Sequence, residues 1–164
     1  MIRKIQIWCL IFSVGMVGLN GCRPEIHYSF KKQNQVILEL ADSLLSTYFS
    51  RYRSKHILFA YGYSKEGLWV LPNQELIQEL NDAGFPVESV KLMEYSEDGS
   101  ILYGPTGESA IIVYVDFLEW KSDRHALVEV GFSGGVLYSA STTYSIKLIN
   151  GEWQIDSIKE MIIS

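Results

Sequence analysis

The sequence predicts an α+β domain in which one long N-terminal helix packs on a curved, cone-like antiparallel sheet. Two observations carry this prediction. Apolar residues recur at three- and four-residue steps from Asn34 to Tyr52, as they do on one face of a helix. From Val87 onward the pattern changes to alternation at every second residue, which is typical of antiparallel strands joined by hairpins. A chain of 164 residues is long enough for one such domain with a core of its own.

A strand and a short helix are predicted between the long helix and the sheet. The segment His56 to Tyr63 is rich in aromatic and branched residues and favours a strand. A helix is expected from Gln74 to Ala83, because Asn73 can cap its first turn and Gly84 can end it.

The remaining strands are predicted to follow one another as a meander. They are Val87–Tyr95, Ile101–Tyr103, Ala110–Trp120, His125–Phe132, Val136–Ile149 and Glu152–Ile158. The pair Asn150-Gly151 is a strong hairpin signal. Alternation assigns one set of apolar residues to the concave side, facing the helix: Ile111, Val113, Val115, Phe117, Ala126, Val128, Val130, Phe132, Val136, Tyr138, Ala140, Tyr144, Ile146, Leu148, Trp153 and Ile155.

The first 22 residues have the features of a secretory signal. Arg3 and Lys4 give a positive start, and a mostly apolar stretch follows. The tetrapeptide Leu19-Asn20-Gly21-Cys22 resembles a bacterial lipobox, with leucine three positions before the cysteine and a small residue just before it. The resemblance implies cleavage between Gly21 and Cys22, and attachment of a diacylglyceryl group and fatty acids such as palmitate to Cys22. Residues 1–21 would then be the signal peptide, 22–32 a lipidated tether and 33–164 a single domain.

Two other interpretations of this segment remain open. The 18 residues from Ile5 to Cys22 carry no charge and come near the length of a membrane-spanning helix. The segment is also compatible with an ordinary cleaved signal and a chance cysteine. The lipoprotein interpretation places the protein in the cell envelope, held to the membrane through the lipid. In a Gram-negative cell, Arg23 after the lipid site would imply the outer membrane, facing the periplasm.

Charge and cysteine content exclude several classes of function. Loss of Arg3 and Lys4 from 14 basic and 19 acidic residues leaves 12 and 19, a net charge of −7. This charge opposes nonspecific binding to nucleic acid. Cys9 lies in the segment that cleavage removes, so the mature chain has no pair of cysteines for a disulfide.

The C-terminal half contains a further resemblance. Its motifs are Glu119-Trp120 before a charged turn, Glu129-Val130-Gly131, Gly134-Gly135, Tyr144 and Asn150-Gly151-Glu152-Trp153. Together they resemble small bacterial domains of the nuclear-transport-factor-like or cystatin-like cone fold. Some of these are immunity proteins of toxin systems, and many are uncharacterised lipoproteins.

We expect a noncatalytic binding or interaction domain, because the sequence departs from the pattern of the enzymes of this fold. The alternatives are a toxin-neutralising immunity lipoprotein and a small isomerase or hydrolase using the cone pocket. Enzymes of the fold place acids or a histidine inside the cone. The concave face predicted here has no carboxylate, so we predict no catalytic residue.

Isolated titratable residues do not form a predicted site. Asp116 and Glu119 could be a general acid and base, although alternation favours solvated positions for both. His27, His56 and His125 are not spaced as metal ligands. We therefore expect no metal and no cofactor, and the sequence does not specify a small-molecule ligand.

One outer-face patch is a candidate interface for a protein partner or a homodimer. Its apolar residues stand where a solvated sheet face should be polar: Ile112, Tyr114, Leu118, Trp120 and Leu127. The alternative is that the predicted helix at 74–83 or the tether covers this patch.

Overall fold

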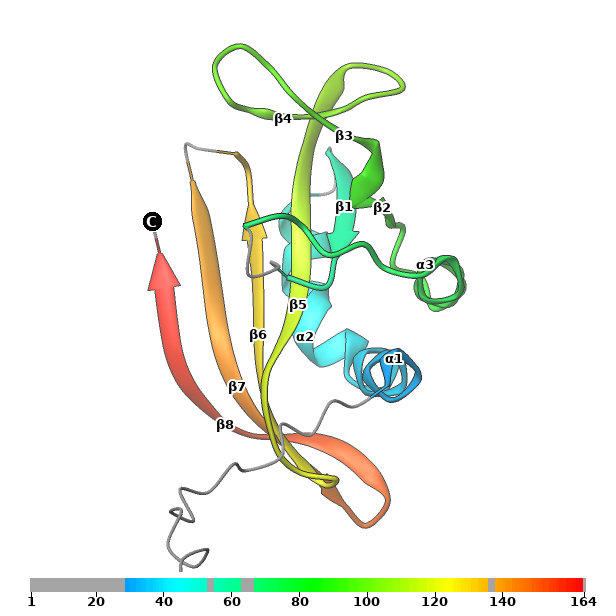
Figure 1. Cartoon of the computed structure of the whole chain (residues 1–164), viewed down its shortest axis with the longest axis vertical. Helices are drawn as coiled ribbons and strands as arrows, with labels where there is room; N and C mark the ends of the chain where they lie inside the picture. The colour runs from blue at the N-terminus through cyan, green and yellow to red at the C-terminus, as the bar shows by residue number, and fades with distance from the viewer. Residues whose placement is uncertain (1–28, 53–54, 63–66, 136–137, 164) are drawn as a thin grey trace, which may run out of the picture.

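The computed structural model describes residues 29–52, 55–62, 67–135 and 138–163 (Figure 1). Strand accounts for 50% of the structure and helix for 26%. In chain order, the elements are α1 (Phe30–Glu39), α2 (Ala41–Arg51), β1 (His56–Ala60), α3 (Gln74–Asp82), β2 (Glu88–Ser89), the 3₁₀ helix η1 (Val90–Leu92), β3 (Met93–Tyr95), β4 (Ile101–Tyr103), β5 (Glu108–Ser122), β6 (His125–Ser133), β7 (Ser139–Ile149) and β8 (Glu152–Ile163).

The prediction of one long helix from Asn34 to Tyr52 is wrong, because the structure has two short helices there, α1 and α2. The backbone leaves helical geometry at Leu40, with φ −105° and ψ 4°. Figure 1 looks nearly along the axis of α1, whereas α2 runs upward behind the sheet. Neither proline nor glycine marks the bend in the sequence. Leu40 is only 4% exposed, so the bend occurs at a core residue and keeps the apolar sides of both helices in one core.

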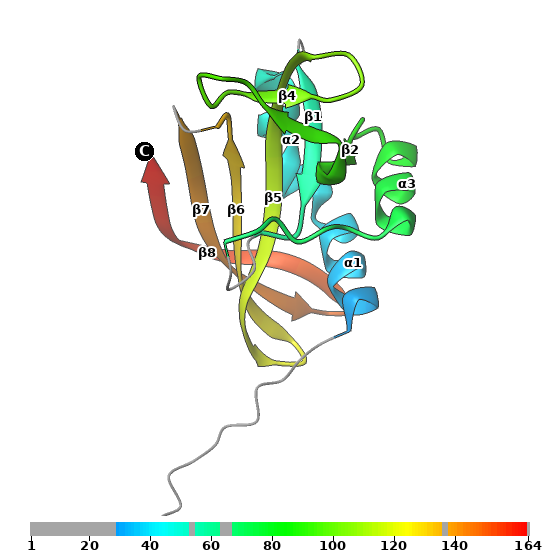
Figure 2. The same ribbon diagram turned by 45° about the horizontal axis from the view of Figure 1, so that its top comes forward.

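The sheet is mixed, so the prediction of an antiparallel sheet is also wrong. The strand order is β2-β1-β5-β6-β7-β8, and β1 pairs in parallel with both β2 and β5. The chain passes from β1 through α3 to β2, and such a helical crossover returns it to the same end of the sheet, where the next strand pairs in parallel. Figure 2 shows α3 beside this parallel edge.

The predicted strand Val87–Tyr95 is broken into β2, η1 and β3. β3 pairs with β4, and β4 pairs with the start of β5, so these short strands form an antiparallel extension of the sheet. Local turn chemistry agrees better with prediction. Asn73 accepts a hydrogen bond from the Leu76 N–H at 2.9 Å and caps α3. Asn150 and Gly151 have φ values of 53° and 91°, as a two-residue hairpin turn requires.

The concave-face assignment is confirmed for the described residues. The larger core cluster joins the inner side chains of β5 to β8 with buried residues of α1, α2 and α3. Every member of the predicted set belongs to it or packs against it, except Val136, which lies outside the described residues. A second, smaller cluster covers the opposite side of β1 and β5. None of the helices in the described ranges is long and apolar enough to cross a membrane.

Candidate functional site

A cleft of about 620 Å³ opens between α2, the start of β1 and the segment that follows α3. It is lined by Ser46, Phe49, Ser50, Lys55, His56, Ile57, Asn81, Gly84, Phe85, Pro86, Val87 and Glu88. Its volume is in the range of small-molecule sites. The cleft lies beside the C-terminal half of α2, which contributes Ser46, Phe49 and Ser50 to its lining.

The floor of the cleft is apolar and its walls are polar. The rings of Phe49 and Phe85 meet edge to face, with centroids 5.2 Å apart. Ile57 and Val87 are buried beside them, at 6% and 3% exposure. Hydroxyl groups of α2 and the amide of Asn81 are among the polar lining groups. An apolar floor with a few polar groups around it suits a ligand with an apolar body.

Lys55 lines the cleft, and its ammonium group is held by a residue outside the lining. Its Nζ donates a hydrogen bond to the hydroxyl of Tyr138 at 3.0 Å and lies 5.7 Å from the centroid of that ring. No ion pair joins it to a carboxylate in the part of the chain that the structure describes. An ammonium group has three donors, and Tyr138 takes one of them.

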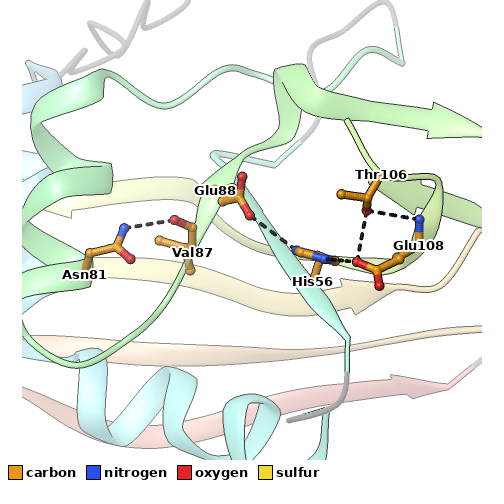
Figure 3. A network of polar contacts seen from close by, with 6 residues as sticks. All are labelled: His56, Asn81, Val87, Glu88, Thr106 and Glu108. Carbon is orange, nitrogen blue, oxygen red and sulfur yellow. Dashed lines mark hydrogen bonds and ion pairs between the residues drawn. The ribbon is translucent and has the colours of Figure 1, made fainter. Parts of the chain in front are cut away.

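His56 lies at the edge of the cleft between two carboxylates (Figure 3). Its Nδ1 is 3.3 Å from Glu88 Oε1, and its Nε2 is 2.9 Å from Glu108 Oε2. The imidazole also stacks on Tyr103, with centroids 4.2 Å apart and an angle of 18° between planes. Because carboxylates only accept hydrogen bonds, both ring nitrogens must donate to satisfy both contacts, which favours the imidazolium form.

The pKa values agree with this pairing. The hydrogen bond to Glu108 raises the pKa of His56, against a lowering by burial. The reciprocal hydrogen bond from His56, followed by that from Thr106, lowers the pKa of Glu108. A hydrogen bond with Glu88 raises the pKa of Tyr103. Glu88, which lines the cleft, and Glu108, which does not, are thus both engaged by side chains of the protein itself.

This cluster ties three neighbouring strands together. Glu88 begins β2, His56 begins β1 and Glu108 begins β5, and parallel pairing brings all three to the same end of the sheet. No group of three or more histidine, cysteine, aspartate or glutamate side chains in the described ranges could hold a metal ion. We interpret the cluster as a brace for one wall of the cleft.

Asn81 holds the residue that precedes Glu88 in the same segment. Its Nδ2 donates to the carbonyl of Ile77 at 2.7 Å and to the carbonyl of Val87 at 2.9 Å. Figure 3 shows the second of these bonds, which connects the end of α3 to the segment leading into β2. Hydrogen bonds with Asn81 and His56 therefore fix the consecutive residues Val87 and Glu88, both of which line the cleft.

The five predicted interface residues do not form one exposed patch. Ile112 and Tyr114 are 0% and 8% exposed in the smaller core cluster. Their cover includes Val90, Ile101 and Trp69, and not the helix at 74–83, whose buried residues belong to the larger cluster.

The other three predicted interface residues differ in environment. Leu118 is 51% exposed, and Leu127 is intermediate. Trp120 packs against the larger core cluster, on the inner side. Contact of these residues with a protein partner or a second copy of the chain stays a prediction.

A β-bulge explains the position of Trp120. The β5–β6 register shifts between Phe117 and Glu119, so one extra residue at Leu118 changes which face the next side chains occupy. Trp120 then stacks on Phe117, with centroids 5.1 Å apart, and meets Trp153 edge to face at 5.8 Å. Simple alternation from residue 112 to residue 120 cannot detect such an inserted residue.

The two predicted carboxylates, Asp116 and Glu119, are separated in environment. Glu119 is exposed and pairs with Lys121 at 3.6 Å, as expected of a solvated position. Asp116 is half-buried, and burial followed by the charge of Glu129 raises its pKa to about 6. Glu129 is the direct cross-strand neighbour of Asp116, a pairing that could be found only with the strand register in hand. This carboxylate pair does not line the cleft.

Exposed apolar side chains gather at the end of β8, the last strand of the sheet. Ile158, Met161, Ile162 and Ile163 are 60%, 63%, 48% and 79% exposed. Two register shifts against β7 interrupt this strand. Bulges and charges on an edge strand oppose pairing with another strand.

Cys22, Gly21 and His27 lie outside the described residues. Comparisons with protein-family models, with curated proteins and with solved structures find no match to this chain. The lipoprotein and cone-fold resemblances therefore stay predictions, and a function has to be argued from the residues themselves.

Proposed function

We propose that this chain is a lipid-anchored protein of the cell envelope whose domain binds a small ligand in the cleft without catalysing a reaction. The observation that carries the proposal is the cleft of about 620 Å³, with its apolar floor and with Val87 and Glu88 fixed by hydrogen bonds. The tetrapeptide ending at Cys22 supports the lipid anchor.

The distribution of titratable groups supports a noncatalytic role. His56 and Glu88, two of the titratable groups that line the cleft, hydrogen bond to each other, and His56 also bonds to Glu108. A general acid or base must reach the proton that it transfers, and these groups already occupy one another. The concave side of the sheet, where the isomerase or hydrolase alternative requires a pocket, is filled by apolar side chains of the helices.

Metabolic labelling tests the first half of the proposal, the lipid anchor at Cys22. Cells grown with radioactive palmitate should label the wild-type protein and the Cys9→Ser variant, because residue 9 precedes the proposed cleavage site. The Cys22→Ser variant should remain unlabelled and leave the membrane fraction. A labelled Cys22→Ser protein, or an unlabelled wild type, would contradict lipidation at this cysteine.

Two tryptophan substitutions on α2 test the second half of the proposal, ligand binding in the cleft. Ser50 on α2 lines the cleft and is exposed, whereas Ser43 on the same helix is exposed and does not line it. Tryptophan at position 50 should fill the cleft, and tryptophan at position 43 should leave it open. Native mass spectrometry of protein released from membranes should show a small-molecule adduct on wild type and Ser43→Trp, and none on Ser50→Trp. If all three proteins carry the same adduct, or none does, the cleft is not the ligand site.

A further inference from the structure

We propose that His56 is a pH-dependent latch on the cleft: as an imidazolium it holds Glu88 in the cleft wall, and as a neutral ring it releases Glu88. This inference rests on the proposed ligand-binding function and adds its regulation by pH. The latch joins the starts of three strands, β1, β2 and β5, because His56 lies between Glu88 and Glu108 (Figure 3).

Glu88 lies where the cleft wall leaves the hydrophobic core. Its neighbour Val87 is only 3% exposed, and the carbonyl of Val87 accepts a hydrogen bond from Asn81. The side chain of Glu88, in contrast, is 37% exposed. β2 begins at Glu88 and is an edge strand of two residues, paired with β1 at two register positions. Short edge pairings of this kind open at the low end of local stability, so the contact with His56 matters for this part of the wall.

Two carboxylates and a phenol surround the imidazole. Nε2 lies 2.9 Å from Oε2 of Glu108 on β5, and Nδ1 lies 3.3 Å from Oε1 of Glu88 on β2. The ring stacks on Tyr103 of β4. Opposite charges this close favour the charged form of a histidine, and the pKa of His56 is raised accordingly.

Two lysines lie next to these elements, and neither replaces the imidazolium as the donor. Lys55 precedes His56 in sequence, and its ammonium donates to the hydroxyl of Tyr138 at 3.0 Å. Lys91 belongs to η1, which packs beside β1, and is exposed. Within the described ranges, neither lysine forms an ion pair with a carboxylate.

Loss of one proton leaves the ring with a single N–H donor, so only one of the two carboxylates can keep its hydrogen bond. Glu108 is favoured because its contact is the shorter one and because the Thr106 hydroxyl already orients its carboxylate, at 3.0 Å. The proton on Nε2 is therefore retained. The proton on Nδ1 passes to solvent, which reaches the ring because the His56 side chain is 31% exposed.

The deprotonated Nδ1 then presents a lone pair to an acceptor oxygen of Glu88. Two acceptors at this distance repel each other, whereas the hydroxyl of Tyr103 and water both offer Glu88 a donor. Glu88 lines the cleft, so its departure from His56 changes the cleft wall. We therefore expect the cleft to be firm in mild acid and loosened at alkaline pH.

Nitrogen-15 NMR of the histidine side chains tests the chemistry of the latch in the mature protein in detergent micelles. The signal of residue 56 is the one missing from His56→Gln. We expect it to titrate above the usual pKa of 6.5 and to report the Nε2–H tautomer at pH 8.5. A titration at or below 6.5, or the Nδ1–H tautomer, would overturn the inference.

Amide hydrogen exchange tests the effect on the wall, with rates corrected for the intrinsic pH dependence of exchange. In wild type, protection of peptides within residues 86–92 should fall about fivefold from pH 5.5 to pH 8.5. This factor lies between those of an exposed ion pair and of a hydrogen bond to a charged group. His56→Gln should remove the fall. The matched control is His125→Gln, which should retain it, because His125 contacts Ser145 and does not line the cleft.

Glu88→Gln separates the latch from a general loss of structure. The amide of this variant can donate to the lone pair of the neutral Nδ1. Protection of the same peptides should therefore no longer fall as pH rises. A fall as large as that of wild type would overturn the latch, because repulsion between two acceptors would not be its cause.

Native mass spectrometry distinguishes failure of the latch from failure of the proposed function. With the latch, wild type should retain its small-molecule adduct more fully at pH 5.5 than at pH 8.5, and Glu88→Gln should retain it equally at both. Equal retention by wild type, or equal protection at both pH values, would overturn the latch and leave the ligand-binding cleft. No adduct on wild type at either pH would overturn the proposed function, and regulation of binding would fall with it.

Discussion

Replacing Trp120 by alanine tests whether the bulge at Leu118 turns this ring toward the core. Its stacked and edge-to-face contacts with Phe117 and Trp153 contribute about 0.5–1.5 kcal/mol each. Lys32 Nζ lies 5.2 Å from the centroid of its ring, a geometry that contributes about 0.5–1 kcal/mol at exposed sites. Because Trp120 is only partly buried, the loss should fall near the low end of large-to-small core substitutions, at about 3 kcal/mol.

The assay is thermal unfolding of the mature protein in mild detergent, followed by far-ultraviolet circular dichroism. A loss of about 3 kcal/mol should lower Tm by roughly 10 °C in a domain of this size. Leu118→Ala is the matched control, because this side chain is 51% exposed and its removal should cost less than about 1 kcal/mol. If Trp120→Ala costs no more than Leu118→Ala, the ring faces outward and the bulge is misplaced.

Three further substitutions test other parts of the structure. His56→Gln should flatten the pH dependence of the free energy of unfolding. The raised pKa of His56 gives stability that is complete below its usual pKa of 6.5 and is lost as pH rises through the raised pKa. The lowered pKa of Glu108 gives stability that is complete above its usual pKa of 4.5 and is lost as pH falls through the lowered pKa. Urea midpoints measured from pH 3 to pH 9 should therefore show the largest wild-type advantage between 4.5 and 6.5, and a constant difference would refute the pairing. Tyr61→Phe removes the hydroxyl that donates to buried Asn34 Oδ1 and should cost about 1–3 kcal/mol in urea unfolding; a loss below about 0.5 kcal/mol would mean that this hydrogen bond is absent. Asn73→Ala removes the cap of α3 and should cost about 1 kcal/mol in the same assay, with an unchanged midpoint as the contrary result.

Features with local causes could be predicted from the sequence. Alternation identified the core-facing side chains of β5 to β8, because one face of these strands is buried and the period of a strand is two. The Asn150-Gly151 turn and the Asn73 cap also follow from residues adjacent in sequence. Each depends on chemistry within a few positions along the chain.

Features with tertiary causes could not be predicted in the same way. The bend at Leu40 has no proline or glycine to signal it. The strand–helix–strand order around α3 is compatible with a parallel crossover, but adjacent pairing of β1 with β5 joins segments about fifty residues apart. The cleft combines residues of three separate segments, and His56 acquires its partners only through those parallel pairings.

The central claim is that the cleft beside α2 is the ligand site of the membrane-anchored protein. Photo-crosslinking with an alkyl diazirine probe on native membranes, followed by peptide mass spectrometry, tests it most directly. The account predicts crosslinks on peptides that contain residues 46–50 and 84–88, which line the cleft, with loss of both in Ser50→Trp and not in Ser43→Trp. Crosslinks confined to the exposed apolar residues at 158–163 of β8 would contradict it.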